Sequence, residues 1–184
     1  MTTLGILIAS ARPNRVGEHV ARWVHETLAA QFPERMDIDL IDLRDVALPD
    51  YDETTSPKQG KPKVTEHGKS WAERIRALDA LIIVTPQYNG AYPGSLKTAI
   101  DWLYAEWNRL PTLLVGYGWG AADEVLPMLE SLMVRVGADV VGSLGLDFRQ
   151  DLSVEGELFV TAEKAAALVD HLSVLEQRVL SPVG

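Results

Sequence analysis

Leu81–Lys97 reads LIIVTPQYNGAYPGSLK, and the rest of the chain is organised around this stretch. It opens with a run of apolar, mostly β-branched residues, which is typical of a strand covered on both faces of a sheet. Pro86 has no N–H to donate to a neighbouring strand and is expected to end this one. The pair Asn89–Gly90 tolerates positive φ and suits a turn, while Pro93 suits the first turn of a helix. The stretch therefore predicts a loop at the carboxyl end of a central strand, where open α/β sheets bind their ligands.

On both sides of this stretch, short apolar runs alternate with segments of helical periodicity. The predicted strands cover residues 4–9, 38–43, 80–85, 112–116 and 139–146, and the predicted helices cover 16–31, 66–78, 94–106, 123–136 and 161–179. Residues 44–66 carry prolines, acids and lysines without periodicity and are predicted to form a long surface loop, which in a compact domain is usually functional or mobile. This alternation predicts one three-layer, doubly wound α/β domain over residues 1–184, with a five-stranded parallel sheet.

The composition narrows the classes of function. With 17 basic and 26 acidic residues, the formal net charge is −9, which argues against nucleic acid or an anionic membrane as partner, because both need a basic face. The chain has no cysteine, so disulfides, thiolate metal sites and cysteine nucleophiles are excluded, and any redox role needs a bound cofactor. No apolar run approaches membrane-spanning length and no signal-peptide pattern is visible, so we expect a cytoplasmic protein.

The loop after the first predicted strand, residues 10–17, combines a hydroxyl, two guanidinium groups and the amides that open a helix. Ser10, Arg12 and Arg15 supply the side chains, and such a helix amino terminus is typical of a phosphate site. The loop has neither a Walker A motif nor the GxGxxG pattern of dinucleotide sites, so one phosphate fits it better than a pyrophosphate. A polar helix-capping loop with solvated arginines is an equally good interpretation of this loop taken alone.

Two further loops are expected at the same edge of the sheet. Tyr88, Asn89 and Gly90 have the groups to read the edge of a flat heterocycle and to cover its face. Residues 117–122 are rich in glycine, which lets the backbone approach a ligand closely, and Trp119 is either an anchor or an exposed lid. Each loop taken alone also has an explanation without a ligand, the first as a turn closed by an asparagine side chain and the second as a common glycine-rich turn.

Neither the histidines of the chain nor Ser10 of the first loop indicates a metal site or a hydrolytic site. His19 and His25 share a predicted helix, but their spacing is neither i, i+3 nor i, i+4, so they do not form a metal-binding pair. Ser10 has no GxSxG setting and no evident His–Asp partner, which argues against a hydrolytic triad.

Residues 85–102, TPQYNGAYPGSLKTAIDW, form a long motif that two shorter motifs flank. Residues 9–17 read ASARPNRVG, and Glu106–Trp107 and Tyr117–Gly118 come later in the chain. Together they resemble the NADPH-dependent FMN reductase family, which has (T)PEYNxxxPxxLKNAIDW, a GSxRxxS-type phosphate loop, EW..KP and SYGG at the corresponding places. The resemblance extends from the first predicted strand to the fourth predicted helix, and the middle motif is the specific one.

The resemblance implies a flavodoxin-like sheet with strand order 2-1-3-4-5 and FMN at the switch point between strands one and three; flavodoxin is itself a standard example of this rule. By position, the FMN phosphate would be held by Ser10, Arg12, Arg15, Val16 and Gly17, and the ribityl chain and isoalloxazine would be lined by Pro86, Gln87, Tyr88, Asn89, Gly90, Tyr117, Gly118, Trp119 and Gly120. The sequence departs from the family pattern at Ala9, where the family has Gly, at Gln87, where it has Glu, and at Trp119, where many relatives are small. We expect the last of these to affect substrate access more than cofactor binding.

The implied activity is transfer of hydride from NADPH or NADH through bound FMN to a small acceptor, such as a quinone, an azo compound, a metal oxyanion or free flavin. The cofactor carries out this chemistry, so no residue is implied as an acid–base catalyst. The resemblance also implies a homodimer or homotetramer. Two alternatives remain open at this point: a flavodoxin-type electron carrier and a non-catalytic FMN-binding protein.

Overall fold

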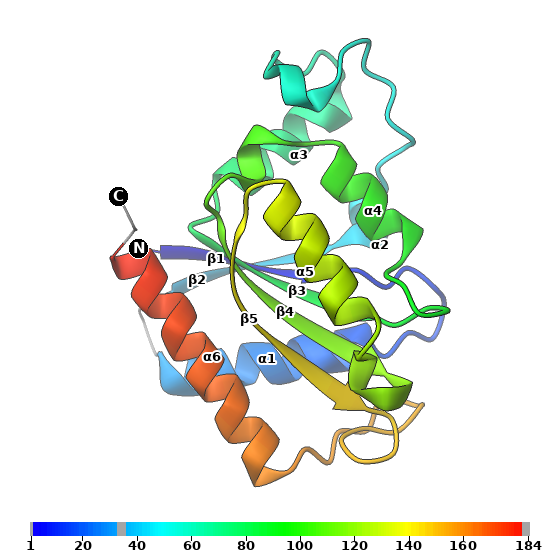
Figure 1. Cartoon of the computed structure of the whole chain (residues 1–184), viewed down its shortest axis with the longest axis vertical. Coiled ribbons are helices and arrows are strands. Elements are labelled where there is room, and N and C mark those ends of the chain that lie inside the picture. The colour runs from blue at the N-terminus through cyan, green and yellow to red at the C-terminus, as the bar shows by residue number, and fades with distance from the viewer. Residues whose placement is uncertain (1, 33–35, 182–184) are drawn as a thin grey trace.

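A single sheet of five parallel strands, in the order β2-β1-β3-β4-β5, forms the centre of the computed structural model, which describes residues 2–32 and 36–181 (Figure 1). The strands are β1 (Thr2–Ile8), β2 (Met36–Asp42), β3 (Ala80–Pro86), β4 (Pro111–Gly118) and β5 (Asp139–Asp147). The order of the strands confirms the expected flavodoxin-like sheet. Every residue of β3 is buried, as the apolar run that begins at Leu81 predicts. The order reverses between β1 and β3, which places the switch point at the carboxyl ends of these two strands.

Helices cover both faces of the sheet and make the fold three-layered. On one face lie α1 (Gly17–Gln31) and α6 (Ala162–Leu180), and on the other α3 (Glu66–Arg76), α4 (Gly94–Asp101) and α5 (Val125–Arg135) (Figure 1). Successive side chains of a strand point to opposite faces, so β3 serves both cores. Ile82 packs among the residues of α1 and α6, and Ile83 packs among those of α3, α4 and α5. In the described part of the chain, no helix has the length and apolar character to cross a bilayer.

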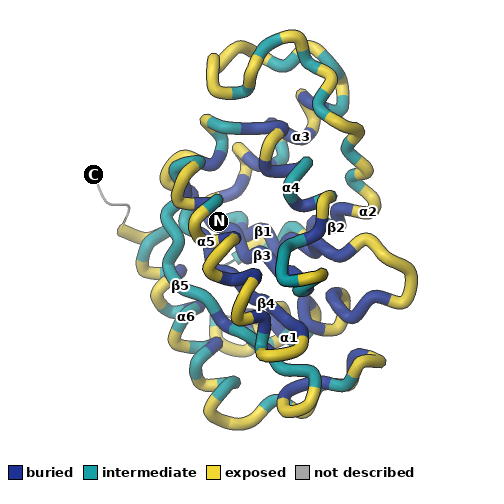
Figure 2. The backbone as a smooth tube through the Cα atoms, turned by 45° about the vertical axis from the view of Figure 1, so that its right-hand side comes forward, coloured by how far each residue is buried: buried dark blue, intermediate teal, exposed yellow. Residues whose placement is uncertain are grey.

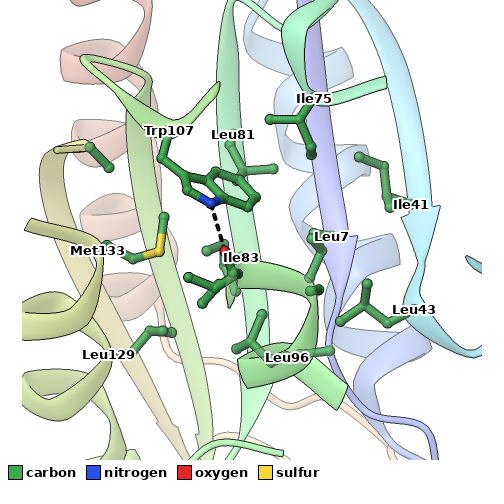
Figure 3. Packing of buried hydrophobic residues seen from close by; sticks show 14 of the residues in the cluster. Leu7, Ile41, Leu43, Ile75, Leu81, Ile83, Leu96, Trp107, Leu129 and Met133 are labelled. Carbon is green, nitrogen blue, oxygen red and sulfur yellow. Dashed lines mark hydrogen bonds between the residues drawn. The ribbon is translucent and has the colours of Figure 1, made fainter. Parts of the chain in front are cut away.

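Three tryptophans fill the core beneath α3 and α4, and each indole N–H donates a hydrogen bond. Trp71, Trp107 and Trp102 donate to the carbonyl oxygens of Ala99, Ile100 and Pro49, at 2.9, 3.0 and 2.9 Å (Figure 3 shows Trp107). A buried N–H without an acceptor would cost about 1–3 kcal/mol, so these bonds allow the large rings to be buried.

Two predicted boundaries are corrected by hydrogen bonding that the periodicity does not encode. The predicted helix 94–106 is α4 followed by a separate 3₁₀ turn, η2 (Ala105–Trp107), and the Ile100 carbonyl accepts the Trp107 indole instead of continuing a helix. The predicted strand 112–116 extends to Gly118, because Tyr117 and Gly118 pair with β5. These two residues therefore belong to β4 and not to a loop.

The segment predicted as the loop 44–66 is ordered by local contacts. It contains the short helix α2 (Leu43–Val46) and the 3₁₀ turn η1 (Pro57–Gln59). The Glu53 carboxylate accepts the N–H groups of Val64 and Thr65 at the start of α3. The Lys63 ammonium lies 5.0 Å from the ring centre of Tyr51. Burial lowers the pKa of Lys63. Figure 2 shows that this segment is mostly exposed or half-buried, whereas β1, β3 and β4 are mostly buried.

Candidate functional site

Three loops meet at the carboxyl edge of the sheet, and backbone hydrogen bonds fix their starts (Figure 1). The Ala9 N–H donates to Val84 O at 2.9 Å, which holds the loop after β1 against β3. The Gln87 N–H donates to Tyr117 O at 2.9 Å, which holds the loop after β3 against β4. The third loop is the 3₁₀ turn η3 (Trp119–Ala122), which follows β4 directly. The structure therefore brings together the three segments that the sequence predicts to converge.

The first turn of α1 forms a cradle with unused hydrogen-bonding groups. Val16 at the amino terminus of α1 makes no side-chain cap, so the first N–H groups of the helix have no capping acceptor. The Ser10 hydroxyl is fully buried and makes no hydrogen bond of good geometry with the described residues, although it lies near the Tyr117 hydroxyl. A Cβ on Gly17 would lie 2.4 Å from Ser10 Oγ and 3.0 Å from the Tyr117 hydroxyl, so only glycine keeps this space open. Burial raises the pKa of Tyr117 to about 12, so its hydroxyl is a neutral donor. These groups fit a phosphate.

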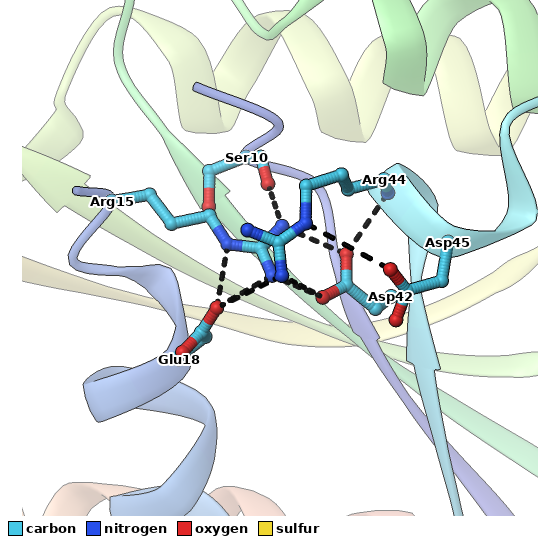
Figure 4. A network of polar contacts seen from close by, with 6 residues as sticks. All are labelled: Ser10, Arg15, Glu18, Asp42, Arg44 and Asp45. Atoms are coloured by element: carbon cyan, nitrogen blue, oxygen red, sulfur yellow. Dashed lines mark hydrogen bonds and ion pairs between the residues drawn. The ribbon is translucent and has the colours of Figure 1, made fainter. Parts of the chain in front are cut away.

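Arg15, a predicted phosphate ligand, forms a clamp that joins the end of β1, the first turn of α1 and the end of β2. Its side chain is 2% exposed, and all five of its N–H groups are used (Figure 4). They donate to Glu18 Oε1 from Nε and Nη2, to Ser10 O at 2.5 Å and to both carboxylate oxygens of Asp42. Burial opposes ionisation of Asp42, but the bond from Arg15 and the backbone N–H of Arg44 hold its pKa below its usual range. Arg15 thus positions the loop and has no donor left for a ligand.

Arg12 is the available cation of this loop. It is exposed, and within the described residues it forms no ion pair. Its guanidinium carbon lies 5.8 Å from the centre of the Tyr88 ring, which joins the first loop to the second through a cation–π contact. The Tyr88 hydroxyl is buried, and no hydrogen bond to it is found in the described chain. The Arg12 guanidinium and the Tyr88 phenol therefore lie close together where the first and second loops meet.

The second loop forms the turn that its sequence predicts. The N–H of Tyr88 donates to Ala91 O at 2.8 Å, and the N–H of Ala91 donates back to Tyr88 O at 3.0 Å. Asn89 and Gly90 have φ values of 50° and 80°. A Cβ on Gly90 would also lie 2.3 Å from a carboxylate oxygen of Glu124, so this glycine serves both the turn and the approach of α5. The prediction of positive φ at this pair is confirmed.

Gln87 has a contact that the sequence pattern does not predict. Its side-chain oxygen accepts the N–H groups of Glu124 and Val125, at 3.2 and 3.1 Å, at the start of α5. This residue therefore caps a helix that begins 38 positions later in the chain and ties that helix to the second loop. Its side-chain oxygen is consequently directed to the helix.

The Gln87 cap can be tested by truncation. Gln87→Ala leaves the first N–H groups of α5 without their acceptor, and we expect a loss of about 1 kcal/mol in the free energy of unfolding, the usual cost of losing an N-cap. Urea denaturation followed by circular dichroism measures this loss. Gln177→Ala, at an exposed position of α6, is the matched control. Equal stabilities of the two variants would show that the side-chain bond contributes nothing.

The third loop presents an exposed ring. Trp119 is 53% exposed at the end of β4 and contacts Phe148 and Arg149 from the segment after β5. A Cβ on Gly118 would lie 3.0 Å from Gln87 Cβ, which explains glycine at this position. Sequence reasoning missed Phe148 and Arg149, as well as Asp42 and Glu124. Asp42 and Arg149 lie at or just after the carboxyl end of a predicted strand, and this position is the one signal that could have pointed to them. Nothing else in the sequence pattern distinguishes them from other polar residues.

A hollow of about 1040 Å³ lies at the opposite edge of the sheet. Its walls carry acids and bases that neutralise one another: Arg76 pairs with Glu106 and Arg178 with Asp139, each at 2.5 Å. This hollow is remote from the switch point and from the three loops. Its paired charges distinguish it from the cradle of α1, where the polar groups are unused.

A parallel sheet of order 2-1-3-4-5, with helices on both faces and three loops at the carboxyl edge beside the switch point, defines a flavodoxin-like protein. Residues 1–150 match the family model of the NADPH-dependent FMN reductases, and the chain belongs to this family. It is 34% identical over 152 residues to the NAD(P)H-dependent FMN reductase LOT6 of Saccharomyces cerevisiae, covering 78% of this chain and 79% of the yeast protein. It is 38% identical over 106 residues to a quinone reductase of Escherichia coli, covering 57% of this chain and 50% of that protein.

The solved structures include the flavoenzyme NAD(P)H:(acceptor) oxidoreductase FerB of Paracoccus denitrificans. It superposes with a TM-score of 0.70 over 96% of this chain and 98% of its own, at 20% sequence identity. At this identity the likeness concerns the fold. The shared fold includes the sheet whose carboxyl edge carries the three loops.

Proposed function

We propose that this protein is an FMN-dependent NAD(P)H oxidoreductase that passes hydride from a nicotinamide nucleotide through bound FMN to a small acceptor. The observation that carries the proposal is the buried Ser10 hydroxyl, without a hydrogen bond of good geometry, at the uncapped start of α1, in a chain of the FMN reductase family. FMN supplies the redox chemistry when it is bound, and the protein supplies orientation and charge. The flavodoxin-like domain of the proposal spans residues 1–184.

In this proposal, the residues at the carboxyl edge of the sheet have different roles. Ser10, Arg12 and the backbone of Val16 and Gly17 bind the phosphate, and Arg15 positions their loop. The ribityl chain and the ring lie along residues 86–90 and 117–120. Gln87 holds that loop to α5 through its side chain. No residue of the chain is assigned a proton-transfer step, because orienting a nicotinamide against a flavin requires positioning and not a nucleophile.

A quinone is the acceptor that the proposal favours among quinones, azo compounds, metal oxyanions and free flavin. The relative named quinone reductase supports this choice. The ring of Tyr88 lies at this edge and favours a flat, apolar acceptor over a small inorganic ion.

The proposal places the protein in the cytoplasm as a homodimer or homotetramer, with no nucleic acid or membrane as partner. Along the outer side of α5, Met128 and Val134 are exposed apolar residues, which supports a contact between copies on this helix. Light scattering coupled to gel filtration measures the mass against 20.2 kDa for one chain. A mass of one chain at micromolar concentration would overturn the oligomer.

The activity is tested by the visible spectrum of the purified protein after addition of FMN and removal of the excess. We expect retained flavin absorbance that NADPH bleaches without oxygen, and that a quinone restores with one quinone consumed per NADPH. Retained flavin that neither NADPH nor NADH reduces would contradict the enzyme and favour a carrier. Flavin that is lost on gel filtration would contradict the site itself.

A further inference from the structure

The turn after β4 presents Trp119 in an exposed position. Gly120, Ala121 and Ala122 have φ values of 67°, 56° and 60°, a conformation that alanine rarely adopts and that persists only when the surroundings impose it. The Gly120 N–H donates to Asp147 Oδ2 at 2.9 Å. A Cβ on Gly145 would lie 1.9 Å from Ala121 O, so β5 packs directly on the turn. The ring of Trp119 is therefore presented by a braced turn.

Arg149 lies against this ring. Its guanidinium carbon is 4.9 Å from the centre of the Trp119 ring, and Phe148 contacts the same indole at 5.4 Å between ring centres. The Arg149 N–H donates to Asp147 Oδ1 at 2.7 Å, which fixes its backbone. Within the described residues, the guanidinium forms no ion pair. A guanidinium that stacks on an aromatic face keeps its N–H edge free for a phosphate.

The charges at this edge of the sheet separate into used and unused cations. Arg15, Arg44 and Lys97 each pair with a carboxylate. Arg12 and Arg149 do not, among the residues that the structure describes. Arg12 belongs to the loop after β1 and Arg149 to the segment after β5, with β3 and β4 between those two strands. One phosphate on α1 accounts for Arg12 and leaves Arg149 for a different anion.

We infer that Trp119 and Arg149 bind the adenosine end of NADPH, with the adenine against the exposed indole and the 2′-phosphate on the Arg149 guanidinium. The inference rests on the proposed function, because it needs the nicotinamide end of the same molecule at the flavin. An arginine near the ribose is the usual means of accommodating a 2′-phosphate. Stacking of bases on aromatic rings is tolerant of geometry and suits an exposed tryptophan. Arg149 is then the residue that makes the enzyme prefer NADPH to NADH.

The test uses the FMN-loaded protein and two probes without nicotinamide, 2′,5′-ADP and 5′-AMP, in isothermal titration. We expect wild type to bind 2′,5′-ADP more tightly than 5′-AMP. Arg149→Ala is expected to weaken 2′,5′-ADP binding at least tenfold, the scale of a lost bond to a charged group. In steady-state assays, we expect Arg149→Ala to lower kcat/KM for NADPH at least tenfold. The ratio of kcat/KM for NADPH to kcat/KM for NADH is therefore expected to fall. Arg135→Ala, an exposed arginine at the far end of α5, is the control and leaves both readouts unchanged.

Other outcomes separate the possible failures. Equal losses for NADPH and NADH in Arg149→Ala would overturn the 2′-phosphate assignment, since both nucleotides carry the pyrophosphate. An unchanged ratio in Arg149→Ala, with normal flavin content, would overturn the role of the arginine. Trp119→Ala is expected to weaken the binding of both 5′-AMP and 2′,5′-ADP. Unchanged binding of 5′-AMP would overturn the adenine contact. Flavin that neither nucleotide reduces in wild type would instead contradict the proposed function.

Discussion

Gly17→Ala is expected to weaken FMN binding about 10- to 100-fold, which corresponds to the 1–3 kcal/mol that overpacking of a close-packed site usually costs. The added methyl group would lie 2.4 Å from Ser10 Oγ and 3.0 Å from the Tyr117 hydroxyl. Both groups line the cradle and neither is the end of a long flexible side chain, so they can move aside only by disturbing the site. Titration of the apoprotein with FMN, followed by quenching of flavin fluorescence, measures the change in affinity.

Gly94→Ala is the matched control for this variant. Gly94 opens α4 as Gly17 opens α1, and a Cβ there would have no atom within 4 Å. Because alanine is also the better helix former, we expect this variant to bind FMN as wild type does and to be no less stable. FMN affinity that stays at the wild-type value in Gly17→Ala would place the phosphate elsewhere.

Asp42→Ala is expected to cost about 3–5 kcal/mol in the free energy of unfolding. Its side chain is 16% exposed, and its removal leaves the Arg15 guanidinium buried with the half-exposed Glu18 as its remaining carboxylate. The cap on the Arg44 N–H is lost as well. Asp45→Ala, 76% exposed on the same short helix, is expected to change stability by less than about 0.5 kcal/mol. Urea denaturation of both variants compares the two costs, and equal costs would show that the Arg15–Asp42 pair is not a major contributor.

The same pair gives the stability a definite dependence on pH. Because the folded pKa of Asp42 lies below its unfolded value of about 3.9, its contribution is complete above that value and is lost as the pH falls through the folded pKa. The difference in unfolding free energy between wild type and Asp42→Ala is therefore expected to be constant above about pH 5 and to shrink below about pH 4. A difference that is the same at pH 3 and pH 7 would contradict this origin.

The sheet could be predicted from the sequence because a strand that is buried on both faces has a continuous run of apolar residues. The run from Leu81 to Val84 identifies β3, and helical spacing identifies the helices on either side. The order of the strands came from the resemblance, since apolar periodicity does not say which strands are neighbours. The ends of α4 and β4 could not be predicted, because an indole N–H at Trp107 and pairing with β5 decide them.

The candidate site could be predicted as a place and only partly as a set of contacts. Residues 10–17, 86–90 and 117–120 converge as expected, and Asn89 and Gly90 adopt the expected turn. Arg15 and Gln87 have other partners, because a side chain can turn to a helix or carboxylate that is distant in sequence. Asp42 lies 27 positions from Arg15, and no local pattern connects them.

The Arg15 clamp also has a consequence for the cost of binding a cofactor at this edge. The guanidinium joins the end of β1, the first turn of α1 and the end of β2 by bonds that lie wholly within the protein. If FMN places its phosphate at this turn, we expect its association to avoid most of the entropic cost of ordering the loop. We therefore expect the chain to stay folded when FMN is removed.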